Sequence, residues 1–167
     1  MNIRRLHAPT ETEIAQLADV LVDCVEGGAS VSFMLPLTRD RAIEFWRDVA
    51  KSIDRRVLLV AEDEQGICGT VQLIFAEPEN QPHRADVSKM LVHRRARRQG
   101  IATALMRELE KAARESGKTL LVLDTADPTA ERVYERTGWT RLGTIPKYAL
   151  LPNGGFCDTV VFYRDLA

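Results

Sequence analysis

Apolar residues in the first third of the chain recur at helical spacing. After Thr10 they stand every three or four positions, at Ile14, Leu17, Ala18, Leu21, Val22 and Val25. Thr10 and Glu13 form a capping box that predicts where this helix begins, and the glycines at 27 and 28 predict its end. Thr38 opens a second helix, whose apolar face contains Ile43, Trp46, Val49, Ala50 and Ile53. A short strand over residues 2–7 is expected to precede both helices.

The hydrophobic pattern then changes to that of strands and mixed elements. Runs of aliphatic and β-branched residues predict strands over residues 57–62, 67–75, 85–92, 119–124, 139–150 and 157–163. A long helix that begins near Gln99 and ends at Gly117, and a short one over 129–137, fall between them. The order βααβββαβαββ predicts an α/β (α+β) fold with a mixed central sheet of about seven strands and about four helices. We expect a single domain over residues 1–167.

Composition and charge exclude several classes of function. The net charge of −1 gives no general attraction to nucleic acid, and the longest apolar run, residues 57–61, is far shorter than the ~20 residues that span a bilayer. The three cysteines form no CxxC pair and no cluster with the histidines, so no metal site is expected. Residues 1–9 lack the apolar stretch of a signal peptide. We expect a cytoplasmic protein without nucleic-acid or membrane partners, and a homodimer is left open.

The junction between the strand ending at Val92 and the helix beginning near Gln99 is the most informative segment. A helix N-terminus leaves backbone N–H groups unpaired and carries a partial positive charge. Gly100 has no side chain to block a ligand, and Ala102 keeps the next turn small, so a pyrophosphate can approach these groups. Four arginines at positions 94, 95, 97 and 98 add positive charge. Taken alone, such a run is more often a solvated basic loop.

A second element lies further along the chain, where Tyr134 stands on a short helix that ends in Gly138 and Trp139. In this order and spacing, the two elements resemble the GCN5-related N-acetyltransferase (GNAT) superfamily. Its signature [Gln/Arg]-x-x-Gly-x-[Gly/Ala] matches residues 97–102, and the resemblance covers most of the chain. It implies the GNAT fold, acyl-CoA-dependent N-acetyltransferase activity and acetyl-coenzyme A as cosubstrate.

The resemblance also implies a role for each part of the site. Leu91 and Val92 would bind the pantetheine arm through their backbone, and the amides from Arg98 to Thr103 would hold the pyrophosphate. Tyr134 would stand beside the thioester sulfur as the catalytic acid. The implied cofactor-binding residues are Leu91, Val92, Arg97, Arg98, Gln99, Gly100, Ile101, Ala102, Thr103 and Asp127. Asp127 stands where many members have asparagine, and a carboxylate cannot donate the hydrogen bond of an amide.

The acceptor side is predicted from two further features. Asp86 is the candidate general base, since superfamily members often place an acidic residue at this point of the strand; Glu62 and Glu77 are fallback candidates. A surface or loop-capping role for Asp86 is equally open. The loop between the first two helices contains many apolar groups, of which Phe33 and Met34 are predicted to line the amine pocket. The alternative is that they pack into the core.

A narrower likeness concerns the acceptor. Residues 27–34, 123–125 and 158–163 are similar to the branch that includes the tabtoxin-resistance acetyltransferase. The predicted function is therefore direct transfer of the acetyl group from acetyl-coenzyme A to the amine of a small molecule, and the branch implies an amino-acid-like toxin or antibiotic. Two alternatives stay open: a non-catalytic regulatory module that binds acetyl-coenzyme A, and acetylation of a protein amine.

Overall fold

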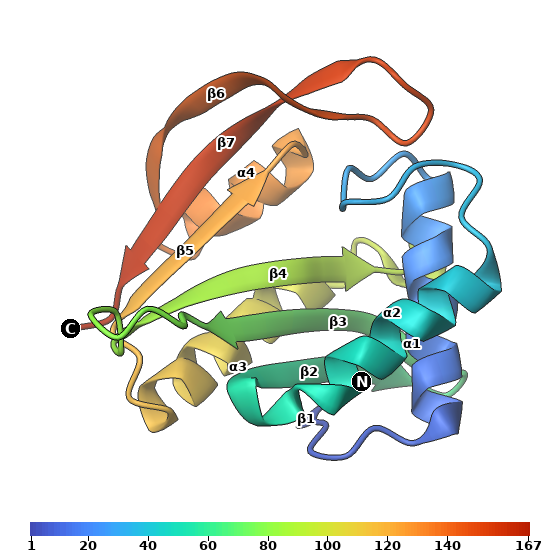
Figure 1. The fold of residues 1–167 in the computed structure, drawn as a ribbon, viewed down its shortest axis with the longest axis horizontal. Coiled ribbons are helices and arrows are strands. Elements are labelled where there is room, and N and C mark those ends of the chain that lie inside the picture. The colour runs from blue at the N-terminus through green and yellow to red at the C-terminus, as the bar shows by residue number, and fades with distance from the viewer.

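One seven-stranded sheet runs through the molecule. In the computed structural model, which describes residues 1–167, its strands lie in the order β1-β2-β3-β4-β5-β7-β6 (Figure 1). The strands are β1 (Asn2–Arg5), β2 (Arg56–Asp63), β3 (Gly66–Phe75), β4 (Arg84–Val92), β5 (Leu120–Thr125), β6 (Thr140–Leu150) and β7 (Phe156–Asp165). All neighbours are antiparallel except β4 and β5, which are parallel. The predicted mixed sheet of seven strands is confirmed.

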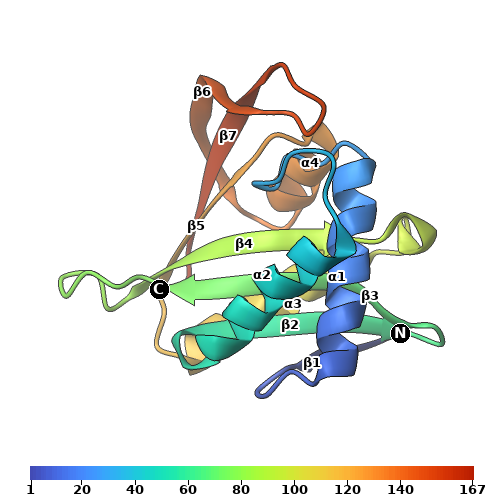
Figure 2. The same ribbon diagram turned by 45° about the vertical axis from the view of Figure 1, so that its right-hand side comes forward.

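Four α-helices cover the two faces of this sheet. They are α1 (Glu11–Glu26), α2 (Arg39–Lys51), α3 (Ile101–Glu115) and α4 (Pro128–Arg136). Figure 1 and Figure 2 show α1 and α2 on one face and α3 on the other. Single turns of 3-10 helix, η1 (Ile53–Arg55) and η2 (Arg94–Ala96), precede β2 and α3. The order of helices and strands is the predicted one. No helix is both long and apolar enough to cross a membrane.

Strand β2 separates two apolar cores because its side chains alternate in direction. Val57, Leu59 and Ala61 pack into the cluster that contains the apolar faces of α3 and α4. Leu58 and Val60 pack into the cluster formed by α1 and α2. A strand covered by helices on both faces has apolar residues at every position, which explains the uninterrupted run from 57 to 61.

The capping box at the start of α1 has the expected geometry. The Oγ1 atom of Thr10 accepts a hydrogen bond from the amide of Glu13 at 3.2 Å, and the Glu13 carboxylate accepts one from the Thr10 amide at 2.7 Å. Strand β1 ends at Arg5, two residues earlier than predicted. The chain turns there toward the cap, and Pro9 has no N–H with which to continue a ladder.

The sheet divides between its two parallel strands. Strands β4 and β5 pair only over Arg84–Asp86 and Leu120–Val122. Beyond this point β4 stays with β3, while β5 continues beside β7. Figure 1 shows the two strands diverging toward their C-terminal ends. Because strand ends in an open α/β sheet commonly form ligand sites, this divergence locates the candidate site.

Candidate functional site

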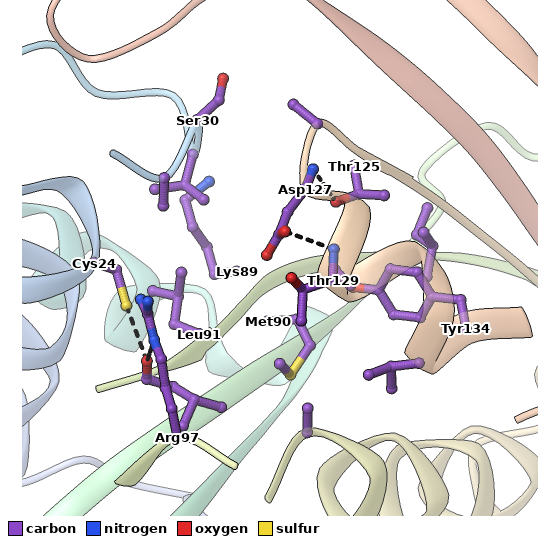
Figure 3. A pocket seen from close by; sticks show the side chains of 18 of the residues that line it. Cys24, Ser30, Lys89, Met90, Leu91, Arg97, Thr125, Asp127, Thr129 and Tyr134 are labelled. Carbon is purple, nitrogen blue, oxygen red and sulfur yellow. Dashed lines mark hydrogen bonds between the residues drawn. The ribbon is translucent and has the colours of Figure 1, made fainter. Parts of the chain in front are cut away.

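A cavity of about 840 Å³ occupies the space between the diverging ends of β4 and β5. Its wall comes from four segments: residues 27–32 after α1, residues 87–92 of β4, the turn and first residues of α3, and residues 123–130 with Tyr134 (Figure 3). The two sequence elements that carried the resemblance therefore face one cavity. No group of three or more metal-ligating side chains gathers in the structure.

One edge of β4 is free to bind a ligand along this cavity. Between Val87 and Val92 the strand pairs with β3 on one side, except at Lys89 and Met90, and β5 no longer pairs with it on the other. The carbonyl of Val92 accepts hydrogen bonds from Cys24 Sγ at 3.5 Å and Arg97 Nε at 3.2 Å (Figure 3). An extended ligand can add to such an edge through backbone hydrogen bonds. Leu91 and Val92, predicted to bind the pantetheine arm, both line the cavity.

The N-terminus of α3 is open toward the same cavity. Gly100 is the N-cap residue, with φ of 76° and no side chain that caps the helix amides. No atom lies within 4 Å of the position that a Cβ would occupy at Gly100. The first amides of α3 are consequently accessible, and the positive end of the helix dipole points at the space in front of them. This geometry fits a pyrophosphate group.

The four arginines before α3 divide into two pairs. The amide and Nε of Arg94 both donate to the Asp23 carboxylate, at 2.8 and 2.9 Å, and Arg95 pairs with the last residue of β2. Burial acts to raise the pKa of Asp23, but these hydrogen bonds hold it below its usual value. Only Arg97 and Arg98 line the cavity. Only these two of the four arginines can therefore supply positive charge at the predicted phosphate position. Arg94 and Arg95 instead form ion pairs that hold the turn against α1 and β2.

Most of the predicted cofactor residues come together around the cavity. Those that line it are Leu91, Val92, Arg97, Arg98, Gly100, Ile101, Ala102 and Asp127. Gln99 is exposed and Thr103 half-buried, and neither lines the cavity. The predicted contact of these two residues with the pyrophosphate involves their backbone amides, so it does not require their side chains to line the cavity.

Asp127 caps helix α4 with its carboxylate. Its Oδ1 atom accepts a hydrogen bond from the amide of Thr129 at 2.8 Å, and its own amide donates to Thr125 Oγ1 at 3.1 Å (Figure 3). Pro128 occupies the first turn, where its missing N–H costs nothing. Aspartate and asparagine are equally good N-cap residues, so Asp127 can cap α4 where many superfamily members have asparagine.

Tyr134 is a buried residue at the cavity wall. It is 5% exposed and packs against Trp139 and Phe162, with ring centroids 6.0 and 5.6 Å away. Burial raises the pKa of its hydroxyl strongly, and the nearby carboxylates of Asp127 and Asp124 raise it further. The phenol therefore stays protonated throughout the neutral range. Its position on α4 fits the predicted role of proton donor.

The structure does not bring Phe33 and Met34 to the cavity. The Phe33 ring packs edge-on against Phe45 of α2, with centroids 5.3 Å apart, and Met34 is 41% exposed on the surface. Residues 27–32 of the same loop line the cavity instead. The loop thus reaches the cavity through residues that precede Phe33, because the apolar side chain of Phe33 packs against α2.

Asp86 also lies outside the cavity lining. It is in the last residue pair shared by β4 and β5, and its carboxylate accepts from Arg84 Nη1 at 2.6 Å. Of the fallback candidates, Glu62 pairs with Arg4 and Glu77 with Arg55. None of these three carboxylates is among the residues that face Tyr134 across the cavity.

Asp124 is a cavity residue that the sequence analysis did not assign a role. It stands near the C-terminal end of β5, and its Oδ2 atom accepts a hydrogen bond from Thr159 Oγ1 at 2.6 Å. Its charge influences both Tyr134 and Lys89. The signal available in the sequence was its place at the end of a buried-type strand, within the segment 123–125 that carried the branch likeness.

Lys89 is the second unassigned residue at the cavity. Burial lowers the pKa of its ammonium group, and the Asp124 carboxylate partly offsets this by raising it. Its Nζ atom donates to Ser32 Oγ at 3.2 Å and lies 5.5 Å from the centre of the Phe45 ring. Figure 3 shows Lys89 on the Ser30 side of the cavity and Tyr134 on the opposite side. Nothing in the local sequence distinguishes it from a surface lysine.

The loop after α1 contacts the hairpin formed by β6 and β7. The Leu35 amide donates to the Pro152 carbonyl at 2.8 Å, and Ser30 Oγ donates to the Leu150 carbonyl at 3.4 Å. Figure 1 and Figure 2 both show the tip of the hairpin beside this loop. Leu151 of the hairpin lines the cavity together with residues 27–32. These contacts cover one end of the cavity.

Comparison with known proteins agrees with this site. The model of the Acetyltransferase (GNAT) family matches residues 26–139, more than half of the chain. An uncharacterized N-acetyltransferase from the hisH-hisA intergenic region of Azospirillum brasilense is 27% identical over 129 residues, 76% of this chain and 76% of its own.

Solved structures share the fold. A ribosomal-protein-alanine N-acetyltransferase from Brucella melitensis has a TM-score of 0.82 and 23% identity, covering 99% of this chain and 100% of its own. A GNAT superfamily phosphinothricin acetyltransferase from Sinorhizobium meliloti, in complex with acetyl-coenzyme A, has a TM-score of 0.83 and 18% identity, covering 99% and 88%. The predicted GNAT fold is confirmed.

Proposed function

Because the chain belongs to the Acetyltransferase (GNAT) family, we propose that it moves the acetyl group of acetyl-coenzyme A to the amine of a small molecule. One observation carries this proposal: a free strand edge, an open helix N-terminus and a buried tyrosine surround a single cavity. The first two features fit the pantetheine arm and the pyrophosphate of the cosubstrate, and the third supplies a proton donor. Acetyl-coenzyme A is the cosubstrate of this acyl-CoA-dependent N-acetyltransferase.

The covered end of the cavity supports a small acceptor. Residues 30 and 35 form hydrogen bonds with residues 150 and 152 of the β6–β7 hairpin, and these contacts restrict this end. The two solved relatives are named for different acceptors, phosphinothricin in one and a ribosomal-protein alanine in the other. An amino-acid-like toxin or antibiotic remains the class that the branch likeness favours.

The reaction is a direct attack. The neutral amine adds to the thioester carbonyl carbon, a C–N bond forms, the C–S bond breaks, and the coenzyme A thiolate leaves. The nitrogen, positively charged after the attack, gives one proton to the general base, which leaves the neutral amide. Tyr134 gives its phenolic proton to the thiolate, and its raised pKa ensures that this proton is present. A thiol of pKa about 8.5 departs fairly well unaided, so this proton accelerates the reaction without being indispensable.

We assign the general base to Asp124 in place of Asp86. Both carboxylates of the cavity wall accept one hydrogen bond, Asp127 from the Thr129 amide and Asp124 from Thr159 Oγ1. Asp127 serves as the N-cap of α4, whereas Asp124 caps no helix, and its charge influences both Tyr134 and Lys89. At pH 7 an amine of pKa 7.8 is about 14% neutral, and one of pKa 10.4 about 0.04%. The benefit of a base therefore increases with the pKa of the acceptor.

Replacing Asp124 tests this assignment. For an acceptor of pKa near 7.8, Asp124→Asn is expected to lower kcat/KM about 10-fold at pH 7, and the loss should shrink above pH 8 as the amine deprotonates by itself. Asp86→Asn, the matched control, is expected to stay within twofold of wild type. Steady-state rates from pH 6 to 9 measure both. If Asp86→Asn lost activity and Asp124→Asn kept it, the base would be Asp86.

The release of free coenzyme A thiol with a panel of amines tests the function itself. The panel contains amino acids, aminoglycosides, polyamines and short peptides. Amine-dependent thiol release with at least one small acceptor is expected. Binding of acetyl-coenzyme A without turnover on any amine would identify a regulatory module, and turnover on the peptides alone would identify a protein amine as the acceptor.

A further inference from the structure

We infer that Lys89 forms an anion-binding subsite at the acceptor end of the cavity, so that the acceptor is an amine that also carries a carboxylate or a comparable oxyanion. This inference rests on the proposed function and names the substrate class of the same site. It follows from three features: the unused hydrogen-bond donors of the Lys89 ammonium group, the distorted backbone of β4 at Lys89, and the negative charge of Asp124 on β5.

The ammonium group of Lys89 has donors that the protein does not use. An ammonium has three N–H donors, and Lys89 gives one hydrogen bond, to Ser32 Oγ at 3.2 Å. No carboxylate oxygen lies within the 4.0 Å of an ion pair. The side chain is half-buried in the cavity wall and lies near the Phe45 ring. A partly desolvated cation that faces a cavity without a counter-ion is a natural partner for an oxyanion of a ligand.

The backbone of β4 is distorted at this lysine. The register between β3 and β4 shifts between Thr70 and Gln72, so that β4 has an extra residue there, and Lys89 has φ of 53°. A positive φ is uncommon for a residue other than glycine and persists where the surroundings impose it. Bulges often redirect a side chain next to a functional site. Here the bulge interrupts the regular alternation of side chains along β4, and the Lys89 ammonium group lies beside Ser32.

The opposite charge lies on the neighbouring strand of the cavity. Asp124 of β5 influences the pKa values of both Lys89 and Tyr134, which places it within electrostatic reach of the reaction centre and of the ammonium group. Since Lys89 and Asp124 do not form an ion pair, a ligand with both charges fits between them. Its amine would lie at Asp124, and its anionic group at Lys89 and the Ser32 hydroxyl. Arg97 and Arg98, which are proposed to lie near the cosubstrate phosphates, line the cavity from the turn before α3 instead.

The test compares acceptors with and without this negative charge. Each amino acid that is acetylated is paired with its methyl ester, and both are measured with wild type, Lys89→Met and Lys89→Arg. Wild type should favour the acid at least 10-fold in kcat/KM. Lys89→Met should raise the KM for the acid at least 10-fold, and leave the KM for the ester and for acetyl-coenzyme A within twofold. Lys89→Arg, which keeps the charge, should retain most of the preference for the acid.

Four outcomes would overturn the subsite. Two concern wild type: equal acetylation of acid and ester, or acetylation of amines of the panel but of none with a carboxylate. The third is an equal loss for acid and ester in Lys89→Met, which is the result expected of a packing role beside Phe45. The fourth is a rise in the KM for acetyl-coenzyme A alone, which would assign the lysine to the cosubstrate. Calorimetric binding of acetyl-coenzyme A and thiol release with any amine would still hold in these cases, so the proposed function is tested separately.

Discussion

Substitution of Gly100 by glutamate is expected to weaken acetyl-coenzyme A binding at least 100-fold. Gly100 caps α3 in front of its open amides, and the space around its missing Cβ is empty. A carboxylate placed there would meet the pyrophosphate at close range. At about 4 Å and an effective dielectric constant of 20, two like charges repel by about 4 kcal/mol, which exceeds a 100-fold change in affinity. Titration calorimetry of acetyl-coenzyme A into the variant measures the loss.

Gly117→Glu is the matched control for this substitution. Gly117 follows the other end of α3, also has a positive φ, of 70°, and also has empty space around its missing Cβ. Both variants therefore introduce the same charge and similar backbone strain. Gly117→Glu should bind acetyl-coenzyme A within twofold of wild type. A folded Gly100→Glu protein with unchanged affinity would remove the phosphate site from the α3 N-terminus.

Substitution of Tyr134 by phenylalanine is expected to lower kcat about 100-fold, with little change in affinity for acetyl-coenzyme A. The phenyl ring keeps the packing against Trp139 and Phe162, so the change removes only the proton donor. Because burial disfavours the phenolate and raises the pKa of Tyr134, the wild-type rate should not fall through loss of this proton below about pH 10. Pre-steady-state and steady-state rates of thiol release measure the effect.

Tyr163→Phe is the matched control, because it removes a tyrosine hydroxyl that lies outside the cavity. Tyr163 is half-buried on β7, where it pairs with Val122 of β5, and it does not line the cavity. Its kcat should match that of wild type. A Tyr134→Phe enzyme that turns over as fast as the Tyr163→Phe control would reduce Tyr134 to a packing residue.

The order of elements was predictable from the sequence because local signals mark each of them. Thr10 and Thr38 are the N-cap residues of α1 and α2. The side chains of β2 point alternately into two apolar cores, so the strand appears in the sequence as an uninterrupted apolar run. The sequence also indicated that Gly100 and Tyr134 belong to one site, because each stands in a recognisable motif. Both residues line the cavity.

The residues of the proposed acceptor end could not be predicted from the sequence, because their positions depend on distant contacts. Lys89 lies at a bulge of β4 that no local pattern indicates, and Asp124 lines the cavity because β5 diverges from β4. Phe33 could have faced either the cavity or the core. Its partner, Phe45, stands on the following helix, and only the packing of that helix decides the outcome.

The most direct test of the proposed reaction is a crystal structure of the protein with acetyl-coenzyme A. We expect the pantetheine arm beside the free edge of β4 between Val87 and Val92, and the pyrophosphate at the amides that follow Gly100. The thioester sulfur should lie within hydrogen-bonding distance of the Tyr134 hydroxyl, about 3.5 Å for sulfur. The acetyl group should face the space between Lys89 and Asp124. Acetyl-coenzyme A bound elsewhere, or bound here with its thioester directed away from Tyr134, would contradict the proposed acetyl transfer.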